Sequence, residues 1–253
     1  MRFPDELPAE REQRWQLLSE LLASWWPSGW GRLTHGISPQ RLDEAERRLG
    51  KPLPVALREW YCGYGALGEF WSRHDKWLAP EELEFVDGVL IFYVENQSVV
   101  QWGIRIGDLV LDDPKVVIDG PDGDSTWRRE SPSLSEFALQ MFLHCLQWSD
   151  KNRGWTSGPA RRGVVRVLKT RYRRLPLRSW SWPAPPTYFL GDEDTLVELN
   201  GTSDMGWWIY ACARSESAFQ KVQEVLARAG FQPEASSDEW PPGWTTAAED
   251  PIA

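Results

Sequence analysis

The stretch of sequence that decides the fold is residues 89–102, VLIFYVENQSVVQW. β-Branched and aromatic residues stand on both sides of a short polar break, a pattern typical of a β-hairpin. The polar break consists of Glu95, Asn96 and Gln97. Residues 89–94 are apolar without alternation, which indicates a strand covered on both faces. In residues 98–106 the apolar residues alternate, with Val100, Trp102 and Ile104 on one face. We therefore expect this hairpin at the centre of a sheet.

The composition favours a folded protein with a basic protein partner. At 253 residues, 42% of them hydrophobic, the chain can hold one large or two small domains. Its formal charge of −9 disfavours nucleic acid as a partner of the whole molecule and would attract a basic protein. Residues 1–150 hold 25 acidic and 15 basic residues, so this part is the acidic one. The 17 tryptophans are scattered along every segment, which favours core packing over a carbohydrate-binding surface.

Neither a membrane span nor a secretion signal is expected. No apolar run approaches the roughly 20 residues needed to cross a bilayer, and no apolar segment follows the acidic N-terminus. Cys62, Cys145 and Cys212 are odd in number, far apart and set among apolar neighbours. We therefore expect buried, reduced thiols in a cytoplasmic protein.

Three helices are expected ahead of the hairpin. Apolar residues at helical spacing predict the first within residues 6–26. A Ser-Pro pair and Gly50 bound the second, and the third follows Pro54. The third leads into GYGALG, residues 63–68, which matches the dinucleotide fingerprint G-x-G-x-x-G. That fingerprint requires a strand before it and a helix after it, and neither is expected here, so we predict a loop.

An acidic turn and a closing helix are expected after the hairpin. Residues 114–118 are predicted to form a further strand. The acidic run at residues 119–124 lacks the alternate oxygen ligands and the final Glu of an EF-hand loop, so we expect no metal there. Ser133 and Glu136 form a capping box before an apolar helix. On this helix His144 is expected to be a hydrogen-bonded core residue rather than a ligand.

Three blocks of sequence follow one another in the first part of the chain. The first is LDEAERRLGKPLPVALREWYCGYG, residues 42–65; the second contains Glu-Asn-Gln and then Trp102; the third runs from Asp113-Pro-Lys-Val through Trp127 to Ser-Leu at residues 133–134. Together they resemble the SUKH superfamily, which includes the yeast cell-wall-synthesis regulator and many bacterial immunity proteins. The chain departs from the family pattern at Tyr64, where asparagine is usual, and in having one proline instead of two before the valine of the third block.

The resemblance covers about residues 37–147 and carries expectations of fold and function. It implies an α+β domain in which helices pack on a mostly antiparallel sheet, and the order of elements deduced from the residues agrees with it. We place this SUKH-like domain at residues 1–148. The resemblance also implies an interaction protein without catalysis, in bacteria most often an immunity protein that binds and blocks a toxin, frequently a nuclease.

The next segment, residues 149–186, is predicted to be a basic linker that contains proline and tryptophan. It carries seven arginines and a lysine between residues 161 and 178, with aromatic residues among and after them. Such a pattern can bind phosphates and stack on bases. The alternative, which the overall charge favours, is a solvated segment or one that docks its positive face on the acidic first domain. Val164, Leu168 and Tyr172 at four-residue spacing indicate a partly buried helix.

A smaller C-terminal extension of the ββα type is expected at residues 187–232. Its clearest strands are residues 195–199 and 207–213, and Ser215 and Gly230 bound its helix. A unit of this size is small for independent stability, so we expect it to extend the first sheet or pack against it. Residues 233–253 are rich in proline, serine, threonine and acids and are predicted to form a mobile tail.

The resemblance, together with the acidic charge, thus implies a non-catalytic protein-binding domain whose partner is a basic toxin. Charge complementarity between the two would speed their encounter and exclude wrong partners. The expected partner-binding residues lie on the hairpin and on the acidic turn: Glu95, Asn96, Gln97, Trp102, Asp119, Asp122 and Asp124. The polar trio has an alternative role, because a short polar side chain such as that of Asn96 suits the turn itself.

Three other functions compete with this one. They are a regulatory or scaffold protein of cell-wall or signalling pathways, nucleic-acid binding through residues 161–178, and an enzyme. His35, His74 and His144 stand in unrelated contexts, and no Ser/His/Asp, Cys/His or metal-spaced cluster is evident. We therefore expect neither catalysis nor a cofactor. The sequence carries no signal for an oligomeric state.

Overall fold

The chain has an α+β fold that divides into two compact units. The computed structural model describes residues 3–25, 36–119, 126–149, 154–202 and 206–236. The N-terminal unit is Pro8–Cys145, and the C-terminal unit comprises Met1–Leu7 and Leu146–Ala253. Among the described residues each unit contains one six-stranded antiparallel sheet. The expected fold class, helices packed on antiparallel sheet, is confirmed.

The long helices of the N-terminal unit agree with the sequence prediction. They are α1 (Arg11–Trp25), α2 (Pro39–Leu49), α3 (Val55–Tyr64) and α5 (Leu134–Trp148), of which residues 146–148 belong to the C-terminal unit. Gly50 ends α2 with φ 67°, a left-handed conformation that glycine adopts without steric strain. The hydroxyl of Ser133 accepts a hydrogen bond of 3.2 Å from the backbone N–H of Glu136, so it caps α5 as expected.

Residues 63–68 are helical, so the prediction of a loop was wrong. The 3₁₀ helix η2 (Gly65–Leu67) and the short helix α4 (Gly68–Trp71) follow α3 directly. Both glycines at the junctions have right-handed helical backbone angles, and Trp71 is fully buried. Packing of α4 therefore outweighs the low helix propensity of glycine. A helix still precedes this string where a dinucleotide site would need a strand.

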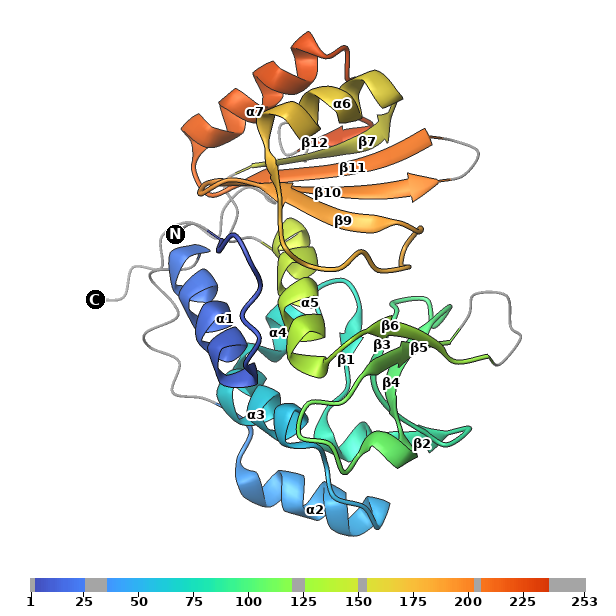
Figure 1. Cartoon of the computed structure of the whole chain (residues 1–253). Coiled ribbons are helices and arrows are strands. Elements are labelled where there is room, and N and C mark those ends of the chain that lie inside the picture. The colour runs from blue at the N-terminus through green and yellow to red at the C-terminus, as the bar shows by residue number, and fades with distance from the viewer. Residues whose placement is uncertain (1–2, 26–35, 120–125, 150–153, 203–205, 237–253) are drawn as a thin grey trace. The chain divides into compact units, whose positions relative to one another are not determined.

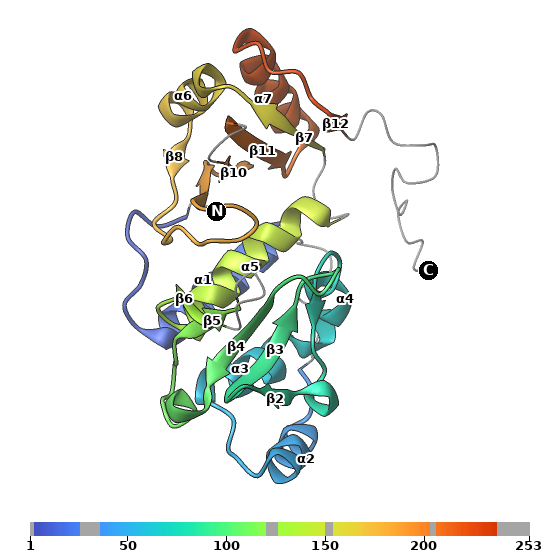
Figure 2. The same ribbon diagram turned by 90° about the vertical axis from the view of Figure 1, so that its right-hand side faces the viewer.

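The sheet of the N-terminal unit has the predicted hairpin at its centre. Its order is β1-β3-β4-β5-β6, and β2 also pairs with β3. The strands are β1 (Lys76–Trp77), β2 (Glu84–Val86), β3 (Val89–Val94), β4 (Gln101–Arg105), β5 (Val116–Ile118) and β6 (Arg128–Ser131). Two 3₁₀ helices, η3 (Pro80–Glu82) and η4 (Ile106–Asp108), precede β2 and follow β4. Figure 2 shows β3 and β4 side by side within the sheet.

Aromatic side chains join the helices of this unit to its sheet. The ring of Phe137 on α5 lies 6.3 Å from that of Trp60 on α3 and 6.1 Å from that of Trp102 on β4, centroid to centroid. Strand β3 carries a bulge at Phe92, which has no partner residue in β4. Because a bulge resets the alternation of side chains, the consecutive residues Phe92 and Tyr93 both contact Phe137, at 5.6 and 6.2 Å. The bulge accounts for part of the missing alternation in this strand.

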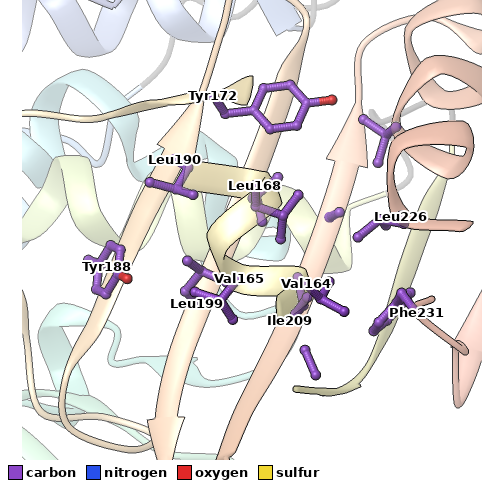
Figure 3. Close-up of a cluster of buried hydrophobic side chains, with 14 residues drawn as sticks. Val164, Val165, Leu168, Tyr172, Tyr188, Leu190, Leu199, Ile209, Leu226 and Phe231 are labelled. Carbon is purple, nitrogen blue, oxygen red and sulfur yellow. The ribbon is translucent and has the colours of Figure 1, made fainter. Parts of the chain in front are cut away.

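The C-terminal unit is a second sheet of order β12-β7-β11-β10-β9-β8. Its elements are β7 (Trp155–Ala160), α6 (Arg162–Arg171), β8 (Arg173–Arg174), β9 (Thr187–Gly191), β10 (Thr195–Thr202), β11 (Gly206–Ala213), α7 (Glu216–Arg228) and β12 (Ala235–Ser236). Helices α6 and α7 lie on one face of this sheet (Figures 1 and 2). In Figure 3, Val165 and Leu168 of α6 lie over Leu199 and Ile209 of the central strands.

This second sheet overturns three of the predicted boundaries. Residues 149–186 are not a linker, because β7, α6 and β8 belong to the sheet, with β7 paired to both β11 and β12. Residues 187–232 do not extend the first sheet, because they complete a sheet of their own. The predicted tail begins too early, because Ala235–Ser236 form β12; residues 237–253 lie outside the described part. The predicted strands, the Ser215 cap and the helix stop at Gly230 are confirmed.

Candidate functional site

The loop between β3 and β4 holds the predicted polar trio, and its hydrogen bonds give Glu95 a structural role. The carboxylate of Glu95 accepts hydrogen bonds from the backbone N–H groups of Gln97, at 2.8 Å, and Val99, at 3.2 Å. The backbone N–H of Glu95 donates to the carbonyl of Val100 at 3.0 Å. Its side chain is buried, so it closes the turn from within. The turn-forming role expected of Asn96 is therefore carried by Glu95.

Asn96 is exposed and lies against a histidine and a buried aspartate. Its side-chain nitrogen is 3.3 Å from Nδ1 of His74, and its backbone N–H donates to Oδ1 of Asp75 at 3.3 Å. Asp75 is 1% exposed. Gln97, the next residue of the loop, is exposed as well. Two of the three predicted trio residues thus remain available to a partner.

Three titratable side chains meet beside this loop, which the sequence did not indicate. The rings of His74 and His144 lie 6.1 Å apart, and Nε2 of His74 is 3.9 Å from Oδ1 of Asp75. Oδ2 of Asp75 has no hydrogen-bond partner among the described residues. The two histidines were predicted to stand in unrelated contexts, and that prediction was wrong. They are 70 residues apart in the chain, and only the fold of α5 onto the sheet brings them together.

Burial dominates the electrostatics of this cluster. Desolvation raises the pKa of Asp75 above its ordinary value, and the charge of Glu95 acts in the same direction. Positive charge on His144 and His74 and the N–H of Asn96 oppose the shift. His144 is itself buried, as expected, and His74 is about one-third exposed. No group of three or more potential metal ligands occurs among the described residues, so this is not a metal centre of that kind.

Asp119 lies at the same end of the sheet as the trio. Its backbone N–H donates to the carbonyl of Gln101 at 3.1 Å, and Oδ1 accepts from the N–H of Gln101. Burial raises the pKa of Asp119, although the N–H of Gln101 favours its charged form. Because Gln101 directly follows the β3–β4 loop, two segments predicted to form one surface are neighbours. Asp122 and Asp124, like His35, lie outside the described residues.

The structure excludes Trp102 from the predicted partner-binding residues. Its side chain is 0% exposed and packs edge-on against Tyr93, with ring centroids 5.8 Å apart. The register of β4 turns Trp102 toward α5 and the core, where a partner cannot touch it. Its part in the family-like signature is therefore structural.

The opposite end of the same sheet exposes apolar side chains beside carboxylates. We call this region the 106–112 surface; its members are Val55, Asp87, Ile106, Asp108, Val110 and Leu111. Two backbone hydrogen bonds of 2.8 Å join its segments, from Ile106 to the carbonyl of Gly88 and from Ala56 to the carbonyl of Asp112. Val110 is 80% exposed, and its three apolar neighbours are exposed too. Contiguous exposed apolar groups are a mark of interaction surfaces.

The sequence itself contains a signal for this surface, in the segment that follows β4. Residues 106–113, IGDLVLDD, continue the apolar run of β4 beyond the strand and then end in acids. Only Leu109 of this segment is buried, whereas the described elements leave Ile106, Val110 and Leu111 exposed. Apolar residues left over after the helices and strands are assigned are candidates for contact with a partner.

The N-terminal unit carries an excess of acidic residues. It holds 22 acidic and 14 basic residues, a formal charge of −8. Many of the acids are paired, for example Glu81 with Arg41 at 2.8 Å. No ion pair is found for Asp87 or Asp108 within the described residues, so their charge is left to solvent or a partner.

No helix in the described part of the chain is long and apolar enough to cross a membrane.

No protein-family model, curated protein or solved structure matches this chain.

Proposed function

We propose that the N-terminal unit is a non-catalytic protein-binding domain, and that the chain is an immunity protein which binds and neutralises a bacterial toxin with a basic surface. The observation that carries the proposal is the 106–112 surface, where exposed apolar groups adjoin carboxylates without cationic partners among the described residues. The resemblance of three sequence blocks to the SUKH superfamily supports the choice of a toxin as the partner.

The chemistry of this surface fits a binding interface. Interfaces gain affinity from a few well-packed apolar anchors surrounded by a polar rim. Val110 and Leu111 are suited to the anchor role because both already face solvent in the free protein. Asp87 and Asp108 supply negative charge at the edge, which would attract a basic partner and raise the association rate at low salt. The formal charge of −8 on this unit acts in the same direction over a longer range.

The first experiment tests the function itself. A candidate toxin, sought among the genes next to the one for this chain, is expressed in bacteria with and without the chain, and growth is scored. We expect the full chain to restore growth and to form a complex with the toxin in purified form. No rescue, together with co-purification of host proteins of the cell envelope or signalling, would instead support a regulatory scaffold.

The second experiment locates the contact. Val110→Asp places a charge at the proposed anchor, and we expect it to weaken toxin binding at least about tenfold. Val167→Asp makes the same change at an exposed valine of the C-terminal unit and is the matched control. Charge reversal at Asp119, Asp122 and Asp124 tests the alternative contact that the sequence predicts. Loss of binding by that reversal, with Val110→Asp unaffected, would move the contact to the β3–β4 loop.

The His74–Asp75–His144 cluster is assigned no catalytic role in this proposal. An acid or base must reach a reacting atom, and two of these three side chains are buried. We therefore expect the double variant His74→Ala with Asp75→Asn to neutralise the toxin as well as the native chain does. Loss of neutralisation with toxin binding intact would point to catalysis.

A further inference from the structure

The outer face of α6 carries cations that no acid in the described part of the C-terminal unit neutralises. Arg162, Arg166 and Lys169 are exposed and spaced four and three residues apart, so they form one stripe along the helix. Among the described residues none of the three has an ion-pair partner, and α6 contains no acidic residue. By contrast, Arg228 on α7 is paired with Glu224 at 3.1 Å. The buried face of the same helix holds it on the sheet, as Figure 3 shows for Val164, Val165 and Leu168.

The stripe borders a hollow of about 330 Å³ that has an aromatic wall. The hollow is lined by Arg162, Val165, Arg166, Lys169, Thr170 and Trp207. None of the described residues that line it is acidic, and the indole of Trp207 is partly exposed. Its volume lies near the lower end of the range of small-ligand sites, about 300–1,000 Å³. A solvated charged helix would present cations without such a wall.

Lys169 is held against two aromatic rings, and one of them, that of Trp207, lines the hollow. Its Nζ lies 5.4 Å from the ring centroid of Tyr188 and 5.5 Å from that of Trp207. These two rings meet edge to face at 5.7 Å, and Arg174 lies 4.6 Å from the Tyr188 ring. Tyr188 is 4% exposed, and its hydroxyl has no hydrogen-bond partner among the described residues. Cation–π contacts restrict these flexible side chains before any ligand arrives.

We infer that this face of α6 binds single-stranded nucleic acid. Arg162, Arg166 and Lys169 would contact consecutive phosphates, and a base would stack on the exposed part of Trp207. Unpaired cations next to an aromatic platform are the combination by which proteins bind single strands without sequence preference. The free N-terminal end of α6, with no side-chain cap and no acid in its first turn, adds a favourable dipole for phosphate. The formal charge of −9 on the whole chain makes the binding weak and sensitive to salt.

An acidic protein surface is the competing occupant, and the hollow argues against it. Carboxylates would be satisfied by the cations alone and would not need Trp207. The inference is independent of the proposed immunity function, since it concerns the C-terminal unit and a different class of partner.

The test measures anisotropy of a fluorescently labelled single-stranded oligonucleotide titrated with the full-length chain at several salt concentrations. We expect affinity to fall with salt, and the double variant Arg162→Ala with Arg166→Ala to bind about tenfold or more weakly and to lower the salt slope by about 1.4. Trp207→Ala is expected to lose about tenfold and Trp207→Phe much less, because phenylalanine still stacks. Circular dichroism confirms that each variant is folded.

The matched control is the double variant Lys221→Ala with Arg228→Ala, which removes the same charge from α7. It should bind like the native chain. The inference is overturned if no binding occurs at low salt or if the α7 variant loses as much affinity as the α6 variant. It is also overturned if an acidic peptide competes as well as unlabelled oligonucleotide while Trp207→Ala has no effect, since that result would identify an acidic protein as the ligand.

Discussion

Asp75 shows how a single buried carboxylate links stability to pH. Its pKa is raised because desolvation outweighs the charges of His74 and His144 and the N–H of Asn96. In the unfolded chain an aspartate side chain has a pKa of about 4. The stability that comes from protonated Asp75 is therefore complete below that value and is lost as the pH rises through its higher folded-state pKa. Above this window the folded protein holds a carboxylate whose Oδ2 has no hydrogen bond from the part of the chain that the structure describes.

Asp75→Asn is expected to raise the free energy of unfolding at about pH 7 by roughly 1 kcal/mol, because the amide removes the buried charge and keeps an oxygen for the Asn96 N–H. The gain should shrink toward zero near about pH 4, where the native side chain is protonated. Urea unfolding across this pH range measures both effects. Asp87→Asn, which makes the same substitution at an exposed position, is the control. A variant less stable than the native chain at neutral pH would mean that the histidines hold Asp75 in a favourable ion pair.

Gly103 is the residue at which the central hairpin tolerates no side chain. A Cβ there would lie 2.4 Å from Cγ1 of Val89 and 2.6 Å from the backbone oxygen of Leu90. We expect Gly103→Ala to destabilise the N-terminal unit by about 1–3 kcal/mol, because a backbone atom must shift. Gly107→Ala, whose Cβ would meet nothing within 4 Å, is the control. Thermal unfolding compares the two, and equal midpoints would contradict the predicted clash.

At the residue scale, local chemistry could be predicted and long-range neighbours could not. The polar trio was correctly placed in a turn because the turn signal lies within a few consecutive residues. The contact of His74 with His144 has no counterpart in local sequence, since it depends on how α5 packs. Trp102 was assigned to a binding surface because a sequence motif does not tell whether its residues are buried. The register of β4 decides that this side chain lies in the core.

Among the elements, α3 contributes the side chain on which the N-terminal core converges. Trp60 is 0% exposed, and its ring lies 5.3 Å from Trp71, 5.2 Å from Trp77 and 6.3 Å from Phe137. These partners come from α4, β1 and α5, so one residue joins four elements. The unusual number of tryptophans therefore has a packing explanation in this unit, as the sequence suggested.

Trp60→Ala is expected to lower the free energy of unfolding of the N-terminal unit by about 3–5 kcal/mol, since the cavity is surrounded by rings from several elements. Chemical denaturation followed by circular dichroism measures the loss. Val110→Ala, at the exposed end of the sheet, should change stability by less than about 0.5 kcal/mol. A loss below about 1 kcal/mol for Trp60→Ala would show that the core closes around the gap.

The elements that the sequence missed are short or of mixed composition. Strands β1, β2 and β6 have two, three and four residues, too few to show a period. Strand β7, WTSGPA, contains glycine and proline, which favour a loop. It is a strand because β11 and β12 pair with it on either side. Tertiary pairing outweighs local propensity in each case.

For the molecule as a whole, the division into two units changes which part of the chain can stand alone. The C-terminal unit takes in β7 and α6, so its core includes Val164, Val165 and Leu168. The segment at residues 187–232 lacks those side chains and three strands of its sheet, β7, β8 and β12. A sheet without its partner helices and strands buries too little apolar surface to fold.

We therefore expect a fragment of residues 146–236 to unfold cooperatively and a fragment of residues 187–236 to be unfolded. Circular dichroism and denaturant titration distinguish the two. The longer fragment should be less stable than the same unit in the full chain, because it lacks Phe3, a buried residue of the N-terminal segment. A cooperative transition for the shorter fragment would show that β7 and α6 are dispensable.

The place of β7 in the second sheet also sets the order in which a growing chain can fold. Ala160 is synthesised 53 residues before Ala213, the end of the strand that β7 pairs with. At a synthesis rate of about 5–20 residues per second, roughly 3–10 s pass between the completion of β7 and the completion of β11. During that interval the apolar side of α6 has no sheet to cover. The arginines and the lysine on the other side of this helix keep the unfinished segment soluble and disfavour association between nascent chains.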